Sequence, residues 1–230
     1  MSENNNFNDI SGAEIYLVPD GRDTDACTDA FQEMYDIEVP TFEPRSYEAT
    51  TQGRTFVQVK GKDVPELIAN GFGDVGITGS DSCYEYLLEQ DTMYLLGSGS
   101  KMPAINFQEI GEAMCKFSLL AFPEVAKLYK DGPPGYIRGG GSFRPVVTSY
   151  PNWLRGLSGG SERSVLWPLP IRVRGKIEGM LQLTGVDFAA DIVSTGDTAA
   201  ANGLEECFAL SEVKPVVVVK PEGAPRGPLY

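Results

Sequence analysis

The fold is decided by residues 54–79, which read RTFVQVKGKDVPELIANGFGDVGITG. The β-branched alternation of residues 54–59 predicts a strand, and residues 74–77 predict a second, short and buried strand. Between them we expect a helix that begins at the N-cap Asp63 and carries a proline in its first turn, where the missing N–H costs little. A strand, a helix and a strand in this order are typical of a parallel α/β sheet covered on both faces.

The same alternation continues on both sides of this segment. The further expected strands comprise residues 13–19, 93–96, 116–122, 145–148, 165–173, 189–193 and 215–220. The further expected helices comprise residues 25–35, 80–89, 123–130, 150–157 and 177–183. Pro168 and Pro170 confine their strand to a sheet edge, and the Gly/Ser run at 97–100 predicts a loop or a hinge. We therefore expect an α/β protein with mostly parallel sheets flanked by helices.

The composition excludes several classes of chemistry. The chain has 230 residues, with 32 acidic against 19 basic side chains, a net charge of −13 and no histidine. Without histidine, neither Ser-His-Asp nor Cys-His catalysis nor a histidine zinc site is available. The acidity argues against broad nucleic-acid binding, which needs clustered Lys and Arg. An anionic ligand must therefore be held by a few local cations, by backbone N–H groups or through a metal.

The sequence favours a cytoplasmic protein with reduced thiols. Its start, MSENNNFNDISG, is polar and lacks the apolar segment of a signal peptide. No run approaches the ~18 apolar residues that a membrane span needs. Four cysteines are widely scattered, without a C-x-x-C pair: Cys27, Cys83, Cys115 and Cys207. A disulfide framework or a four-cysteine metal site stays formally open, but four free thiols are the favoured interpretation.

Residues 190–204 carry the clearest chemical signal. An apolar strand that contains Asp191 runs into Ser-Thr-Gly-x-Thr and then into helix-forming alanines. Hydroxyls and free backbone N–H groups at the start of a helix form an anion site, and Gly196 lets the backbone approach a phosphate closely. Asp191 can accept hydrogen bonds from sugar hydroxyls, and Asn202-Gly203 is expected to end the helix in a left-handed turn. From the residues alone, an ordinary strand–turn–helix with Ser and Thr as caps remains the alternative.

The string D-I-V-S-T-G-x-T-x-x-x-N-G-L in this segment closely resembles the phosphoribosyl-pyrophosphate (PRPP) loop of ATP phosphoribosyltransferase. Four more segments resemble motifs of that family. They are P-D-G-R at 19–22, D-V-P at 63–65 followed by N-G-F-G-D-V-G-I-T-G at 70–79, T-S-Y-P-N at 148–152, and G-K-I-E at 175–178. All five occur in the family's order over about residues 15–220, which is far more specific than one loop.

The resemblance implies a two-lobed fold like that of type II periplasmic binding proteins. Lobe one would comprise residues 1–98 plus 206–230, and lobe two residues 99–205, including the PRPP loop at 190–204. The family reaction joins N1 of the adenine of ATP to C1 of PRPP and releases pyrophosphate, with Mg²⁺ present, as the first step of histidine biosynthesis. The length leaves no room for a C-terminal regulatory domain. It therefore implies the short form, a homodimer that pairs with a regulatory subunit similar to histidyl-tRNA synthetase.

The resemblance also assigns the site residues. The expected PRPP contacts are Asp191, Ser194, Thr195, Gly196, Asp197 and Thr198. The expected ATP contacts are Ser149, Tyr150 and Glu178. The expected catalytic cations are Arg22, Arg45, Lys60 and Lys116, each of which could instead be a solvated surface charge. No protein nucleophile is needed, because catalysis would rest on positioning and on neutralising the pyrophosphate, with Mg²⁺ held mainly by substrate phosphates.

Several positions depart from the family pattern. Asp20 replaces the lysine of P-K-G-R and so reverses a charge, and Lys60 stands where an arginine usually precedes D-V-P, which loses the bidentate fork that suits phosphate. Lys176 replaces the serine of G-S-V-E, and residues 180–183 lack a proline. These departures keep a second hypothesis open, in which the chain is a non-catalytic two-lobed module that senses a phosphorylated small molecule.

Overall fold

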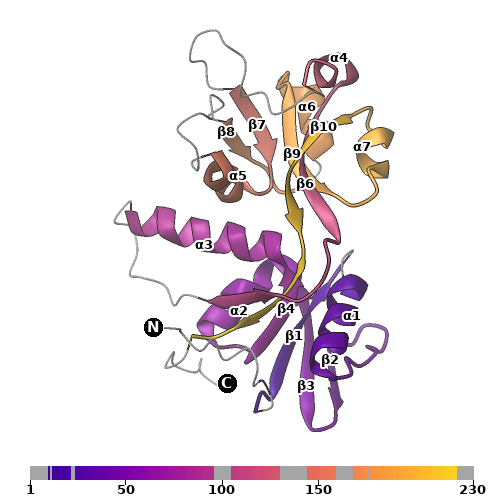
Figure 1. Cartoon of the computed structure of the whole chain (residues 1–230), viewed down its shortest axis with the longest axis vertical. Helices are drawn as coiled ribbons and strands as arrows, with labels where there is room; N and C mark the ends of the chain where they lie inside the picture. The colour runs from indigo at the N-terminus through magenta and orange to yellow at the C-terminus, as the bar shows by residue number, and fades with distance from the viewer. Residues whose placement is uncertain are drawn as a thin grey trace. The chain divides into compact units, whose positions relative to one another are not determined.

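The chain folds into two compact α/β units (Figure 1). The structure, a computed structural model, describes residues 10, 12–21, 24–95, 105–129, 144–158, 168–175 and 177–221. The first unit comprises Met1–Met114 with Lys214–Tyr230, and the second comprises Cys115–Val213. Both boundaries lie later in the chain than 98/99 and 205/206, where we placed them. The expected hinge at 97–100 lies outside the described residues.

The first unit is built on a six-stranded sheet with the order β2-β3-β1-β4-β11-β5. The strands are β1 (Ile15–Asp20), β2 (Glu48–Thr51), β3 (Arg54–Lys60), β4 (Val75–Gly79), β5 (Asn106–Glu109) and β11 (Pro215–Val219). The helices are α1 (Thr24–Tyr35), α2 (Val64–Asn70) and α3 (Ser80–Leu95), with a 3₁₀ turn at Gly61–Asp63. β1 pairs in parallel with β3 and β4, whereas the other three pairings are antiparallel.

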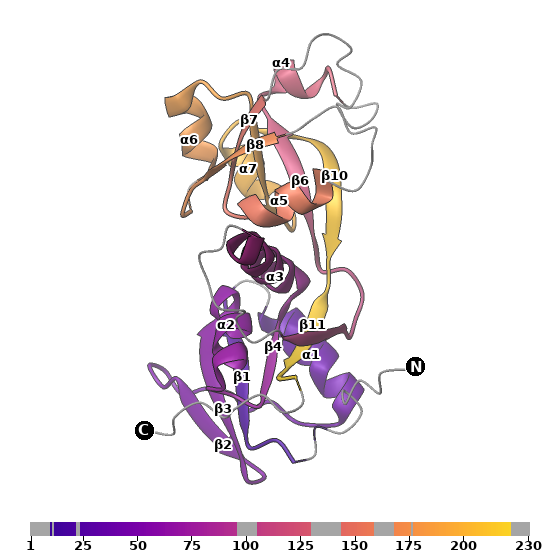
Figure 2. The same cartoon turned by 90° about the vertical axis from the view of Figure 1, so that its left-hand side faces the viewer.

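Helices cover both faces of this sheet. Successive side chains of a strand point to opposite faces, and β1 divides in this way. Tyr16 packs in the core that contains Phe31 of α1, and Leu17 packs in the core that contains Ile68 of α2 and Cys83 of α3. Figure 2 shows α1 on one side of the sheet and α2 and α3 on the other. The two-sided burial explains why β4 is buried along its whole length.

The second unit has a five-stranded sheet with the order β10-β6-β9-β7-β8. The strands are β6 (Cys115–Ala121), β7 (Arg144–Thr148), β8 (Pro168–Arg172), β9 (Phe188–Val193) and β10 (Glu205–Val213). The helices are α4 (Pro123–Ala126), α5 (Pro151–Ser158), α6 (Ile177–Thr184) and α7 (Asp197–Ala201). β7 is parallel to β8 and β9, and β6 is antiparallel to β9 and β10. One face packs against α6 and α7, through residues that include Leu181 and Ala199.

Two units of α/β type confirm the expected fold class, but the sheets are mixed rather than mostly parallel. Only the β3-β1-β4 and β9-β7-β8 groups are parallel. One antiparallel pair is the β2–β3 hairpin, whose two-residue turn at Gln52 (φ 50°) and Gly53 (φ 77°) suits the right-handed twist of the strands. Two other antiparallel pairs involve β11, in which the chain returns to the first unit after leaving it beyond β5. β11 runs antiparallel to both β4 and β5.

Four further differences from the sequence expectation concern single elements. Residues 93–96 were expected to form a strand, but α3 continues through Leu95. A short apolar run is ambiguous between helix and strand, and no Gly or Pro separates it from the helix before it. β2, β5 and β10 were not expected at all. The expectation for the Pro168–Pro170 strand is confirmed, because β8 lies at a sheet edge.

The four cysteines are buried and none of them forms a disulfide. Burial raises the pKa of the Cys83 thiol well above 9.0, so this group stays protonated at neutral pH. Such thiols behave as small apolar side chains rather than as nucleophiles. In the described part of the chain, no helix is long and apolar enough to cross a membrane.

Candidate functional site

The segment predicted to bind a phosphate forms a strand, a loop and a short helix in the second unit. β9 ends at Val193, residues 194–196 form the loop, and α7 begins at Asp197. Gly196 has a φ of 82°, which L side chains rarely adopt, so glycine suits this position. The first N–H groups of a helix have no acceptor within the helix. The loop therefore offers backbone donors beside exposed hydroxyl side chains.

The end of α7 also follows the sequence expectation. Gly203 has a φ of 71° and donates its N–H to the carbonyl of Ala200 at 3.0 Å. The N–H of Leu204 reaches back to the carbonyl of Ala199 at 2.9 Å. These two bonds form a Schellman motif, which satisfies the last carbonyls of the helix. The expected left-handed end at Asn202-Gly203 is confirmed.

Inside the loop, Thr195 and Asp197 contact each other. The hydroxyl of Thr195 donates to Oδ2 of Asp197 at 2.6 Å, and the N–H of Asp197 lies 3.4 Å from Oγ1 of Thr195. Both side chains are exposed. A carboxylate repels a phosphate, so Asp197 is better suited to orient Thr195 than to hold the phosphate itself.

The strand order brings other expected residues to the same sheet edge. β7 is parallel to β9, so both end at this edge, where ligands bind in open α/β sheets. Ser149 follows directly after β7, and the hydroxyl of Thr148 accepts the N–H of Tyr150 at 3.0 Å. β6 runs the other way and begins here, with the exposed Lys116 paired in register with Val193. Ser149 and Lys116 therefore share one edge with the 194–198 loop.

One residue of this region was missed from the sequence. Ser118 on β6 pairs in register with Asp191 on β9, so the two side chains point to the same face. Asp191 is half-buried. Ser118 is fully buried, and its Oγ has no hydrogen-bond partner among the residues that the structure describes. The available signal was one serine in the otherwise apolar stretch after Lys116.

We expect Ser118→Ala to stabilise the protein by about 1 kcal/mol, because a buried hydroxyl without a partner costs about 1–3 kcal/mol of desolvation. Urea denaturation would measure the change. Ser211→Ala is the matched control, since the Ser211 hydroxyl lies at a more exposed position, where it donates to the carbonyl of Glu212 at 3.3 Å. A loss of stability in Ser118→Ala would show that the hydroxyl has a partner in the folded protein.

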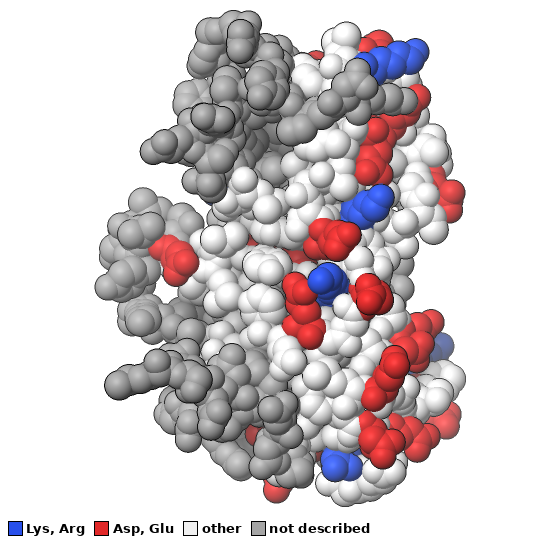
Figure 3. Space-filling view, in the orientation of Figure 1, with Lys and Arg blue, Asp and Glu red and all other residues white. Residues whose placement is uncertain are grey.

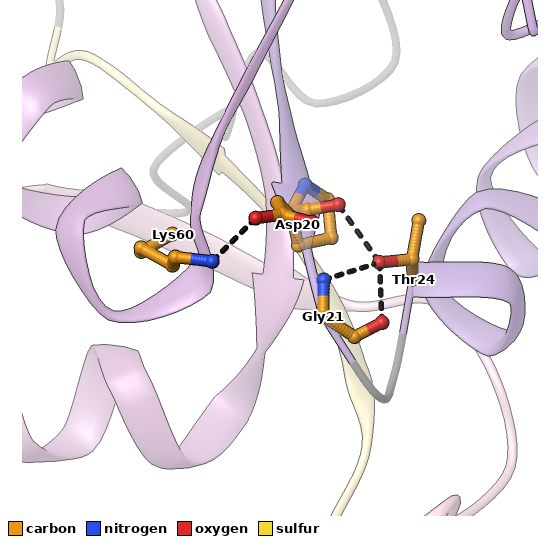
Figure 4. A network of polar contacts seen from close by, with 5 residues as sticks. Asp20, Gly21, Thr24 and Lys60 are labelled. Carbon is orange, nitrogen blue, oxygen red and sulfur yellow. Dashed lines mark hydrogen bonds and ion pairs between the residues drawn. The ribbon is translucent and has the colours of Figure 1, made fainter. Parts of the chain in front are cut away.

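In the first unit, two of the departures from the family pattern bind each other. Asp20 ends β1 and Lys60 ends β3, and the two are register partners in adjacent parallel strands. Figure 4 shows the ammonium of Lys60 pointing at the carboxylate of Asp20, with which it forms an ion pair. This bond raises the pKa of Lys60, so the ammonium stays charged. Lys60 therefore already has an anionic partner.

The backbone at this edge is fixed by two threonines. The Thr24 hydroxyl lies 2.9 Å from the carbonyl of Pro19 and 2.8 Å from that of Gly21, and it accepts the N–H of Gly21 at 3.0 Å (Figure 4). The buried Thr78 donates to the carbonyl of Gly61 at 2.9 Å. The segments that carry Asp20 and Lys60 are thus each tied to a neighbouring element.

Arg45 belongs to the same edge of the first sheet. It is exposed, with a φ of 68°, and shortly precedes β2. The antiparallel pairing of Glu48 with Val57 continues in a bond from the N–H of Gln58 to the carbonyl of Tyr47. Because β2 is antiparallel to β3, the segment that contains Arg45 enters β2 at the end where β3 finishes.

A family model described as ATP phosphoribosyltransferase matches residues 60–226, which is well over half of the chain. The chain belongs to the ATP phosphoribosyltransferase family. The match begins at Lys60 and includes the 194–198 loop. Members of this family are pentosyltransferases, so the chain is classed as an enzyme.

Curated ATP phosphoribosyltransferases show the same similarity. The protein of Staphylococcus carnosus is 28% identical over 171 residues, which cover 74% of this chain and 67% of that protein. The protein of Clostridium kluyveri is 32% identical over 158 residues, covering 65% of this chain and 56% of that protein. Among solved structures, the ATP phosphoribosyl transferase (HisG:HisZ) complex from Thermotoga maritima matches with a TM-score of 0.58 and 19% identity, over 90% of this chain and 88% of that one. At this identity the likeness shows the fold.

Tyr150, one of the residues expected to contact ATP in this phosphoribosyltransferase, lies in the hydrophobic core. Tyr150 is 5% exposed, and its ring packs edge-on against Phe117 at 5.7 Å and Trp153 at 6.1 Å. Trp153 itself stacks on Phe117 at 4.5 Å. An aromatic residue after a strand is a poor guide to ligand contact, because rings are large and pack readily. Tyr150 therefore has no exposed ring face for adenine.

Some residues discussed in the sequence analysis lie wholly or partly outside the described part of the structure. Arg22 and Lys176 are outside the described residues. Glu178 is the second residue of α6, but its side chain is outside the description. The roles expected of Arg22 and Glu178 stay predictions.

The charged side chains on the surface are mainly acidic. In the view of Figure 3, acidic side chains cover more of the surface than basic ones do. Among the described residues, no three Cys, Asp or Glu side chains are grouped to hold a metal ion. The carboxylates near the loop, on Asp191 and Asp197, are separate oxygen donors rather than a cage.

Proposed function

We propose that the chain transfers the phosphoribosyl group of PRPP to N1 of ATP, giving phosphoribosyl-ATP and pyrophosphate in the first step of histidine biosynthesis. The observation that carries this proposal is the 191–204 segment, with its glycine loop at the carboxyl edge of β9, in a chain of this family. N1 of adenine forms a bond to C1 of the ribose as the bond from C1 to the pyrophosphate oxygen breaks, and pyrophosphate leaves with the electron pair.

We propose that the loop anchors the ribose end of PRPP. The hydroxyls of Ser194, Thr195 and Thr198, with the backbone at Gly196, would hold the 5′-phosphate, as helix-start N–H groups do in other phosphate sites. Asp191 would accept the ribose hydroxyls. The Thr195 hydroxyl, which donates to Asp197 in this structure, would donate to the phosphate instead, so the Asp197 carboxylate would orient the threonine only until the phosphate binds. Holding the ribose lets C1 develop positive charge in a fixed position.

The cations would balance the negative charge of the substrates. Lys116 lies at the loop edge, and Arg45 and Lys60 lie at the edge of the first sheet. We assign them to substrate phosphates, along with Arg22. Mg²⁺ would be held chiefly by the phosphate oxygens of the substrates. When bound, this ion would neutralise charge on the leaving pyrophosphate.

We also propose that the chain forms a homodimer and works with a regulatory subunit similar to histidyl-tRNA synthetase. The Thermotoga maritima structure of matching fold is named as a complex of two proteins, HisG and HisZ.

The test is to mix the full chain with ATP, PRPP and Mg²⁺, with and without a candidate regulatory subunit, and to follow phosphoribosyl-ATP by mass spectrometry. We expect product and pyrophosphate in equal amounts, and none without PRPP. PRPP binding without product under either condition would contradict the proposal. That result would favour the second candidate, a non-catalytic sensor of a phosphorylated molecule, which the neutralised Lys60 supports.

A further inference from the structure

We propose that Asp20 is an internal counter-ion that occupies Lys60, and that a polyphosphate binds at the carboxyl edge of the first sheet by displacing the Asp20 carboxylate. Asp20 would thus set the affinity of this edge for anions without touching the ligand. The inference depends on the proposed function only for the class of ligand, a polyphosphate such as the triphosphate of ATP or released pyrophosphate.

The placement of the two residues supports this role. They are the last residues of β1 and β3, which pair in parallel register up to Asp20 and Lys60. Paired residues of adjacent strands point to the same face, so the carboxylate is the nearest neighbour of the ammonium. The pair also lies at the carboxyl ends of parallel strands, where α/β sheets bind their ligands.

Both side chains are open to solvent. The side chain of Lys60 is 70% exposed and that of Asp20 is 45% exposed. Exposed ion pairs are weak, and breaking one changes an equilibrium by only about two- to fivefold. A ligand with several negative charges can therefore replace a single carboxylate. Because the bond to Asp20 raises the pKa of Lys60, the exchange at neutral pH substitutes one anion for another and releases no proton.

The exchange needs only side chains to move. Thr24 bonds to the backbone of Pro19 and Gly21 on either side of Asp20, and Thr78 bonds to the carbonyl of Gly61 next to Lys60. With both backbone segments held, a rotation of the Asp20 side chain is enough to free the ammonium (Figure 4). Asp63 also contributes to the field at Lys60, but its influence is smaller than that of Asp20.

The experiment measures binding of inorganic pyrophosphate to the full chain by titration calorimetry at low salt. We expect Asp20→Asn to bind pyrophosphate about two- to fivefold more tightly than the unmodified chain, which is the range for losing an exposed ion-pair partner. Lys60→Gln should bind more weakly, and Asp20→Asn should have no effect when Lys60 is already glutamine. Glu38→Gln is the matched control, because it removes one exposed negative charge beyond the far end of α1 and should leave binding unchanged.

Three results would overturn the proposal. The first is that Asp20→Asn leaves binding unchanged or weakens it. The second is that the gain persists in the Lys60→Gln background, which would make it a general effect of net charge. The third is that no variant binds pyrophosphate. Circular dichroism of each variant checks the fold. Because no ATP, PRPP or regulatory subunit is present, the outcome is independent of whether phosphoribosyl-ATP is formed.

Discussion

Replacing Asp191 with alanine is expected to weaken PRPP binding by at least about 100-fold. The side chain lies near the carboxyl end of β9, three residues before Ser194 of the 194–196 loop, and is half-buried. If it accepts two ribose hydroxyls, alanine removes two hydrogen bonds to a charged group, each worth about 1.5–3 kcal/mol. The sum of about 3–6 kcal/mol corresponds to a loss of about 10²- to 10⁴-fold in affinity. Titration calorimetry with PRPP would measure it.

Two further variants keep this result interpretable. Glu206→Ala removes an exposed carboxylate from the same unit, at the opposite end of the sheet, where Glu206 pairs with Leu120. It should leave PRPP affinity unchanged. Asp191→Asn retains an acceptor oxygen and should give an intermediate loss, even if alanine disturbs the strand. Unchanged affinity in both Asp191 variants would show that the loop is wrongly assigned to PRPP.

The features that the sequence predicted well are encoded within a few residues. The strand–helix–strand order expected for residues 54–79, which β3, α2 and β4 follow, shows this. Gly71 has a φ of 81°, and the N–H of Phe72 reaches the carbonyl of Leu67 at 3.0 Å, so the helix ends in the same Schellman motif as α7. Asp74 belongs to the motif that resembles the family, and its Oδ2 accepts the N–H groups of Glu14 and Ile15 at 3.0 Å. Its role is to tie β1 to the turn before β4, which only the structure reveals.

The features that were missed depend on distant partners. β10 alternates polar and apolar residues only weakly, and its strand character comes from pairing with β6. The bond between Asp20 and Lys60 joins residues 40 positions apart, which become neighbours only through the β1–β3 register. From the sequence alone, Asp20 and Lys60 were two separate departures from the family pattern, each of which weakened phosphate binding. In the structure they are one ion pair, so neither should be interpreted without the other.

Replacing Gly76 with alanine is expected to destabilise the protein by about 3 kcal/mol, because the added methyl group has no space. A Cβ at this position would lie 2.4 Å from Cγ1 of Val64 and 3.0 Å from Cγ1 of Ile68, both fully buried on α2. The backbone of β4 thus packs directly against the helix, and alanine must push the two elements apart. Urea denaturation would measure the loss.

The control for this prediction has the opposite sign. Gly179 lies in α6 with nothing within 4 Å of a Cβ and no positive φ, so Gly179→Ala should stabilise by up to about 1 kcal/mol, through helix propensity. A loss of less than 1 kcal/mol in Gly76→Ala would show that α2 can move away from β4 at little cost. Since α2 follows directly from Lys60 and the Gly61–Asp63 turn, such mobility would reach the Asp20–Lys60 pair. A large loss instead means that the close packing of α2 on β4 holds this edge of the first sheet in place.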